Sequence, residues 1–267
     1  MDAAVLREAF SRVCRSRTAA RAFKAGGDGA VPGDVLRGVL ELTQCAPSSF
    51  NLQPYKLVVV QSSAQREALA GAMLGAGNAQ RCRDAPVTVV FAADRDPAQL
   101  TRRVMQLERK SGTDASYVAA LPSRVSFLLG SGVLSKAFRA AATHLLSPLS
   151  PTPKIAHSLD GWACKNAGLA ASTFMLAAQA HGLATAPMEG FDERRVGFLL
   201  GVPADRYSIP LVVSAGYAQE GEAEGGGQRQ QQQGEQGELE EGAPRRRFPL
   251  SEVACLDSFS EPFPPAR

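Results

Sequence analysis

The stretch WACKNAGLAASTFMLAAQAH, residues 162–181, is the most informative segment of the chain for its fold. Apolar residues occupy nearly every position and leave almost no polar face, which predicts a helix that is buried all round. Such a helix is covered either by its own monomer or partly by a second subunit, and both arrangements stay open on this pattern alone. Gly182 follows the stretch after His181 and is suited to a left-handed cap that ends the helix.

The rest of the chain mixes short apolar runs with amphipathic segments. The runs predict strands at 56–61, 87–93 and 211–217. Helical spacing predicts helices at 5–13, 34–42, 64–73, 98–110 and 192–200, and two more within 114–146. Helices and strands do not alternate regularly, and no glycine-rich fingerprint follows a strand. We therefore expect an α+β fold and no Rossmann dinucleotide site.

Composition indicates an ordinary globular chain of 267 residues, 45% apolar and 21% charged, and excludes collagen, coiled-coil and wholly disordered classes. Residues 219–241 are Gln, Glu or Gly at 20 of 23 positions. We expect a disordered insertion at about 219–243 within a single domain spanning 1–267. Without 219–241, with its seven Glu and one Arg, 28 basic and 19 acidic residues remain. This basic body favours an anionic ligand.

Cysteine usage and targeting signals restrict the remaining classes. The five cysteines contain no Cys-x-x-Cys pair, and the three histidines complete no metal-ligand spacing. We expect reduced, mostly buried thiols, no disulfide framework and no metal. No segment has the length and apolarity of a secretory signal or a membrane span. The six cations among the first 24 residues resemble a mitochondrial presequence, but Asp2 and Glu8 argue against one. We expect a cytoplasmic protein, with a mitochondrial or plastid location left open.

Two segments in the first quarter of the chain offer groups for ligand binding. Arg17 and Arg21 lie four residues apart at the expected exit of the first helix, where two guanidinium groups can grip a phosphate. The loop APSSFNLQPY, residues 46–55, places two hydroxyls and two amides between two prolines that fix its backbone. Taken alone, the first pattern is also that of a solvated face and the second that of a rigid turn.

Two further segments lie near the other end. In APMEGFD, residues 186–192, Gly190 permits a close backbone approach to a ligand, and Asp192 is suited to cap the next helix. Glu189 has no partner carboxylate or histidine in the motif, so we assign it a structural or orienting role. The cluster RRR, residues 245–247, is a second cationic group and is short for a nucleic-acid patch.

Together these segments resemble the nitroreductase family of FMN-dependent oxidoreductases, over roughly residues 5–95 and 160–260. The most specific parts are APSSxNxQP at 46–54 and PMEGFD at 187–192, supported by NxxRxxDAP at 78–86 and WxxK at 162–165. The resemblance implies a three-layer fold with a central mixed sheet flanked by helices, and a homodimer with the long helix at its interface. Thr18-Ala19 departs from a serine common in that region, and Tyr55 stands where tryptophan is common.

The resemblance also implies roles for individual residues at the flavin. Arg17 and the pair Arg245 and Arg247 would hold the phosphate, while Arg21 and Arg81 would stabilise negative charge near N1 of the ring. Residues 48–51 would come from the partner subunit, and 187–190 would lie along the ring. The implied FMN-binding set is Arg17, Thr18, Ala19, Arg21, Pro47, Ser48, Ser49, Asn51, Asn78, Arg81, Pro187, Met188, Glu189, Gly190, Arg245 and Arg247.

The implied reaction needs no catalytic side chain, because the flavin carries the chemistry. Hydride would pass from NAD(P)H to flavin N5 and then to a nitroaromatic, a quinone or a similar conjugated acceptor, in a ping-pong sequence. Residues 99–159 match nothing in the family, so the acceptor is not predicted. One alternative keeps the fold but changes the reaction to reductive dehalogenation or flavin fragmentation. Another is a basic nucleic-acid-binding protein without flavin, whose binding would weaken steeply with salt.

Overall fold

The computed structural model describes residues 2–24, 29–129, 159–219 and 247–264. Contacts group the chain into two units, Met1–Glu220 and Gly221–Arg267, and each is described by itself. Of the elements formed by the described residues, the first unit holds the sheet and all helices except α10. In the described part of the second unit, α10 (Leu250–Val253) is followed by a backbone bridge between Cys255 and Pro262.

A four-stranded antiparallel sheet forms the centre of the first unit. Its strands follow the spatial order β1 (Tyr55–Val60), β2 (Val87–Asp94), β4 (Tyr207–Gly216) and β3 (Ala184–Met188). Every residue of β2 is buried, as expected for an apolar strand with neighbours on both sides and helices on both faces.

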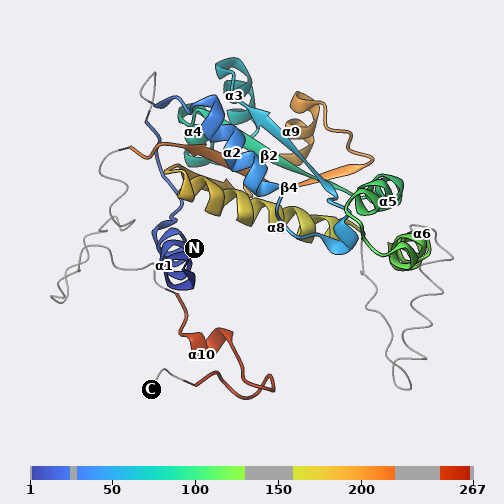
Figure 1. Ribbon diagram of the computed structural model, residues 1–267. Coiled ribbons are helices and arrows are strands. Elements are labelled where there is room, and N and C mark those ends of the chain that lie inside the picture. Colours follow the sequence, from blue (N-terminus) through green and yellow to red (C-terminus); the bar gives the residue numbers. More distant parts are fainter. Residues whose placement is uncertain (1, 25–28, 130–158, 220–246, 265–267) are drawn as a thin grey trace. The chain divides into compact units, whose positions relative to one another are not determined.

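Helices cover both faces, so the fold has three layers (Figure 1). Val89 and Phe91 pack on one side against α2 (Gly33–Thr43) and α8 (Leu159–Ala180). Val90, which points the other way, joins the cluster of α3 (Ser63–Ala70), α4 (Ala76–Asp84) and α9 (Glu193–Leu200). Alternate residues of one strand thus feed two separate cores. The predicted α+β class and the three layers are confirmed.

A third core lies at the N-terminal end of α8. There α5 (Thr101–Lys110) and α6 (Ala115–Leu129), which follow a short 3-10 turn at Pro97–Leu100, pack against Trp162. α1 (Ala3–Ser16) has no buried residue, and its apolar Val5, Leu6 and Phe10 are more than half exposed.

The prediction of a mixed sheet is wrong for the four described strands, because all of them pair antiparallel. The parallel pairing among the described residues is the single bridge Ala19–Thr185 beside β3. β3 was not predicted as a strand. It tolerates Pro187 because it is an edge strand, where a missing N–H breaks no ladder on the open side. Pro210 lies in β4, which is an interior strand, and is tolerated there because the pairing with β2 is interrupted by a register shift between Phe91 and Ala93.

Other expectations meet the structure in part. The segment around residue 78 was read only as a motif and forms α4. Gly182 has φ 76°, as expected for the left-handed cap. The cysteines are free, but Cys14, Cys45 and Cys255 are exposed and not buried as expected. They lie on the surface of α1, in the turn after α2 and in the second unit. Residues 130–146 of the predicted helical region, and 220–243 of the predicted insertion, lie outside the described residues.

α8 is less completely covered than the sequence suggested. Its inner side is buried through residues such as Ala167, Ala170 and Phe174. Its outer side exposes Lys165, Gly168 and Ser172, and Leu169 is 42% exposed. A single chain therefore leaves a stripe of small and apolar residues on this helix open.

Candidate functional site

The segment after α1 runs along the open edge of β3. The Ala20 N–H donates to the Thr185 carbonyl at 2.9 Å, next to the bridge between Ala19 and Thr185. This pairing holds residues 17–21 beside residues 184–188, with Arg17 half-buried and Arg21 exposed. Two motifs that are far apart in the sequence are thereby brought together at one sheet edge.

α4 adds two further predicted residues to the same place. Arg81 Nε donates to the Ala20 carbonyl at 3.2 Å, and its Nη1 donates to Asn78 Oδ1 at 2.8 Å. Asn78 Nδ2 in turn donates to the Gly190 carbonyl at 3.3 Å. A continuous chain of hydrogen bonds therefore joins the first cationic segment, α4 and the segment after β3.

Gly190 lets α4 approach this segment closely. A Cβ at position 190 would lie 2.9 Å from Asn78 Nδ2, closer than side-chain atoms pack. Its carbonyl also accepts from the Leu74 N–H at 2.8 Å. The structure thus shows a close approach of Gly190 to Asn78, whereas the approach predicted for Gly190 was to a ligand.

The edge at β3 retains hydrogen-bonding capacity that the described residues do not use. None of them accepts from the backbone N–H groups of Glu189 and Gly190. The Thr185 hydroxyl has no partner either, although Thr185 is only 1% exposed. A buried polar group without a partner, such as the Thr185 hydroxyl, is uncommon in native proteins and indicates a missing ligand or water, whereas the N–H groups of Glu189 and Gly190 are accessible from outside. Beside Arg17 and Arg21, these donors suit a polar, anionic group such as FMN.

The predicted loop 46–55 is positioned by side chains from three elements. Ser48 Oγ accepts from the Gln53 N–H at 2.9 Å, and the Ser49 N–H donates to Asn166 Oδ1 of α8 at 3.0 Å. Asn51 Nδ2 donates to Glu108 Oε1 of α5 at 2.8 Å. Pro47, at the start of the loop, is exposed.

The backbone of this loop is also strained. Phe50, Asn51 and Gln53 have φ values of 55°, 55° and 46°, in the left-handed region that non-glycine residues avoid. Strain of this kind persists only where surrounding contacts enforce it, and it clusters at ligand-binding sites. The loop therefore has a backbone feature that is typical of ligand-binding segments.

This loop lies at the far end of the sheet from the first cluster, which comprises residues 17–21, Asn78, Arg81 and residues 184–190. Thr185 pairs with Ala215, which pairs with Val87 at the start of β2, whereas Tyr55 pairs with Ala93 near its end. At about 3.3 Å per residue, the two levels are about 20 Å apart along the strand. One chain thus brings together the residues of the first cluster and leaves Ser48, Ser49 and Asn51 apart from them.

Asn166 and Glu108 position this loop and were not singled out from the sequence. Asn166 is fully buried, and its Nδ2 also donates to the Trp162 carbonyl at 2.7 Å. Its polarity inside an otherwise apolar helix was a usable signal. Glu108 Oε2 accepts from Thr113 Oγ1 at 2.6 Å, and hydrogen bonds from Thr113 and Asn51 hold the pKa of its carboxyl below the ordinary value. Nothing in the local sequence links Glu108 to residue 51.

The remaining predicted residues contribute less to this picture. Asp192 caps α9 as expected, accepting from the Arg195 N–H at 3.1 Å. Met188 is buried in the sheet core, whereas Pro187 and Glu189 are exposed. Arg245 lies outside the described residues, and Arg247, which belongs to the second unit, is exposed.

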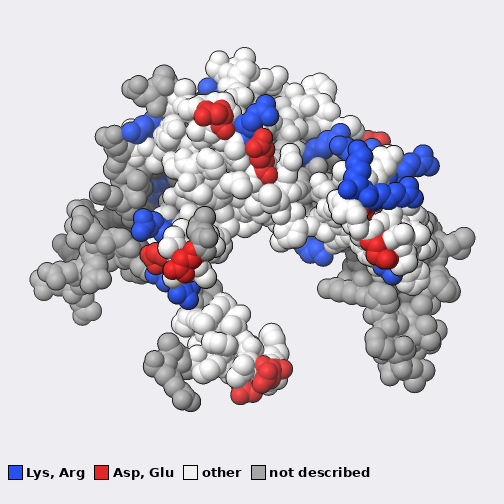
Figure 2. All heavy atoms as spheres, in the orientation of Figure 1, with Lys and Arg blue, Asp and Glu red and all other residues white. Residues whose placement is uncertain are grey.

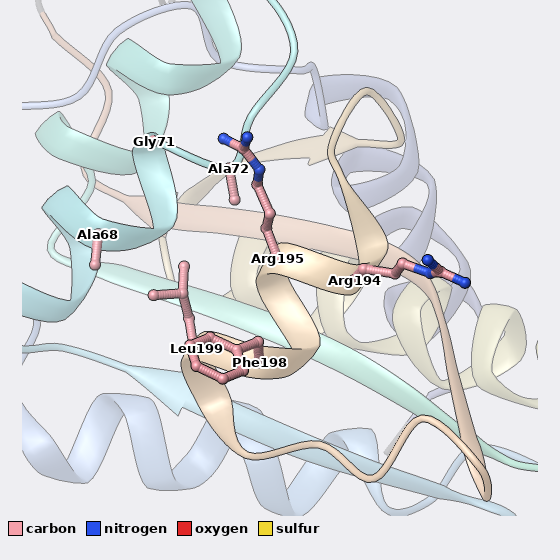
Figure 3. A pocket seen from close by; sticks show the side chains of 7 residues that line it. All are labelled: Ala68, Gly71, Ala72, Arg194, Arg195, Phe198 and Leu199. Carbon is pink, nitrogen blue, oxygen red and sulfur yellow. The ribbon is translucent and has the colours of Figure 1, made fainter.

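A groove of about 400 Å³ lies elsewhere, between α3 and α9. It is lined by Ala68, Gly71, Ala72, Arg194, Arg195, Phe198 and Leu199, and none of these residues belongs to the predicted set (Figure 3). Phe198 is 88% exposed there. The groove is therefore separate from the candidate site. Among the described residues, no helix is long and apolar enough to cross a membrane.

Together the three-layer scaffold and the donors at the edge of β3 define an α+β protein with a site suited to an anionic ligand. A family model described as the nitroreductase family matches residues 14–217. The chain therefore belongs to the nitroreductase family, which confirms the resemblance and makes the protein an oxidoreductase by descent.

Individual relatives agree with this assignment. An NADH dehydrogenase of Thermus thermophilus is 28% identical over 254 residues, which cover 92% of this chain and 98% of that protein. The nitroreductase NfnB of Mycolicibacterium smegmatis is 32% identical over 220 residues, with coverages of 80% and 84%. A protein of Exiguobacterium sibiricum, solved in complex with FMN, has the same fold with a TM-score of 0.64 at 19% identity, and the match covers 92% of this chain and 96% of that one.

Proposed function

We propose that the protein is an FMN-dependent oxidoreductase that oxidises NAD(P)H and reduces a conjugated acceptor such as a nitroaromatic or a quinone. The observation that carries the proposal is the set of unused donors at the edge of β3, next to the chain of hydrogen bonds from Ala20 to Gly190. The FMN complex of a relative with the same fold supports the choice of cofactor. FMN, when bound, would take a hydride equivalent from NAD(P)H and release it to the acceptor in a second half-reaction.

The residues of this chain have binding and electrostatic tasks in that scheme. Arg17 and Arg21 would pair with the phosphate and the pyrimidine edge, through charge-assisted hydrogen bonds worth about 1.5–3 kcal/mol each. The N–H groups of Glu189 and Gly190 would donate to the ring. Arg81 is already held by the Ala20 carbonyl and by Asn78. Its charge is therefore fixed in place before any reduction, which is the condition for electrostatic stabilisation.

We propose further that the working protein is a homodimer in which Ser48, Ser49 and Asn51 serve the partner's cofactor. Within one chain these residues lie about 20 Å along β2 from the first cluster. In such a dimer, each chain would supply Ser48, Ser49 and Asn51 to the cofactor held by the first cluster of the other chain. The exposed apolar groups of α1 and the open stripe on α8 provide the surface for such a contact.

The test is the visible spectrum of the purified protein, before and after addition of NADH or NADPH, with light scattering to give the mass in solution. We expect a flavin band that bleaches with the reductant and returns in air, on a particle of twice the chain mass. Arg17→Ala should lose flavin on dilution more readily than the parent. A protein that stays colourless after FMN is added would overturn the cofactor assignment, and a monomer with full activity would overturn the shared site.

The same preparation separates the competing reactions. Turnover with a simple nitroaromatic or a quinone supports the proposed acceptors, whereas turnover with a halophenol alone would favour reductive dehalogenation. Salt-sensitive binding to DNA by a colourless protein would favour the nucleic-acid reading.

A further inference from the structure

The outward face of α5 is a cationic stripe. Arg102, Arg103, Arg109 and Lys110 recur at i, i+1, i+7 and i+8, so they lie on one side of the helix, and all four are exposed. Val104, on the opposite side, is buried in the core beside α6. Figure 2 shows Lys and Arg side chains gathered where Figure 1 places α5.

Local helix stability accounts for only two of the four charges of this stripe. Arg109 and Lys110 lie in the last turn, where the helix dipole favours cations. Arg102 and Arg103 lie in the first turn, where the helix dipole disfavours cations, and this turn holds no acidic residue. No carboxylate of the described residues forms an ion pair with any of the four cations. By contrast, Arg37 on α2 has a partner, Glu41, at 3.9 Å. Four like charges on one ten-residue helix repel one another, and an anion outside the fold that approaches this face would relieve the repulsion.

The stripe lies on the helix that contacts the strained loop 46–55. The inward face of α5 carries Glu108, which holds Asn51 of the strained loop at 2.8 Å. Under the proposed function this loop serves the flavin bound by the partner subunit. An anion attracted to α5 is therefore concentrated beside the place where the dinucleotide has to react, without needing a fixed contact to the stripe.

We propose that the α5 stripe steers the phosphate groups of the dinucleotide donor and so favours NADPH over NADH; this inference rests on the proposed function. NADPH differs from NADH by a 2′-phosphate, which adds about 1.5–2 negative charges near neutral pH. Attraction to a charged surface grows with the charge of the incoming molecule and is screened beyond about 10 Å at 0.1 M salt. The discrimination thus lies in the association rate and weakens as salt is added.

The experiment measures the second-order rate of flavin bleaching by NADPH and by NADH in stopped flow, with the flavin-loaded protein at about 20 mM and 500 mM salt. The variants are Arg102→Gln/Arg103→Gln, Arg109→Gln/Lys110→Gln and the combination of all four. The control, Arg37→Gln/Arg194→Gln, removes as much charge as either pair from α2 and α9. Electrostatic steering contributes about 10-fold or more to such rates. For the fourfold variant at low salt we expect about a 10-fold loss with NADPH and about a 3-fold loss with NADH.

At 500 mM salt, we expect the fourfold variant to be bleached at the same rates as the parent by both NADPH and NADH. The control should stay within 2-fold of the parent at either salt concentration. Equal losses with NADPH and NADH, or losses as large in the control, would overturn the assignment. A loss confined to reoxidation by an anionic acceptor such as 4-nitrobenzoate, with bleaching unchanged, would overturn it in favour of acceptor steering. A flavin band present in every variant separates these outcomes from failure of the proposed function, which would leave no band to bleach.

Discussion

Replacing Gly190 by Ala tests whether the hydrogen-bonded chain from α4 to β3 holds the cofactor. The added methyl group would lie 2.9 Å from Asn78 Nδ2, about 0.5 Å inside normal contact, so Asn78 has to turn away. The φ of Gly190 is not in the left-handed region, so the backbone itself accepts alanine. Turning Asn78 breaks its bonds to the Gly190 carbonyl and to Arg81, at 3.3 and 2.8 Å.

The expected effect falls on binding more than on folding. Asn78 is half-buried and can shift, so we expect the free energy of unfolding to fall by less than about 1 kcal/mol. Losing the preset positions of Asn78 and Arg81 removes one or two hydrogen bonds from the site, about 1–3 kcal/mol, which raises the Kd for FMN about 5- to 150-fold.

The assay is fluorescence titration of the apoprotein with FMN, alongside thermal unfolding. Gly77→Ala is the matched control, because it lies one residue before Asn78 in the same helix and its Cβ meets nothing within 4 Å. The control should bind FMN like the parent and unfold at the same or a higher temperature. Unchanged FMN affinity in Gly190→Ala would refute the reasoning.

Three further predictions concern stability. Asp94 is buried and accepts from Arg206 at 2.7 Å, so Asp94→Asn should lower the Tm by about 5–10 °C in calorimetry, and an unchanged Tm would contradict the pairing. The lowered pKa of Glu108 contributes stability that is present above the ordinary pKa of a glutamate and lost as the pH falls below it; Glu108→Gln should flatten the Tm profile in that acidic range. Deleting 219–241 should change neither flavin content nor Tm, since this stretch has little apolar area to bury, and loss of either would show that it contributes to the fold.

The sequence was sufficient for features that depend on local pattern. The apolar run at 162–181 and the β-branched runs at 56–61 and 87–93 predicted the central helix and two strands, because periodicity reports directly which side of an element is buried. The cap residues Asp192 and Gly182 followed from the same local chemistry. The motifs APSSxNxQP and PMEGFD were enough to indicate the family.

Tertiary structure decided how these motifs meet. Strand β3 carries Pro187 and has no strong β pattern, so only its pairing with β4 and with residue 19 makes it a strand. The bonds Asn78–Gly190, Arg81–Ala20 and Asn51–Glu108 join residues from 57 to 112 positions apart. No local propensity encodes such contacts, because their energy appears only after the sheet has brought the two segments to the same edge. The sequence by itself therefore determined which groups this protein offers a ligand, and the packing of the sheet determined which of them act together.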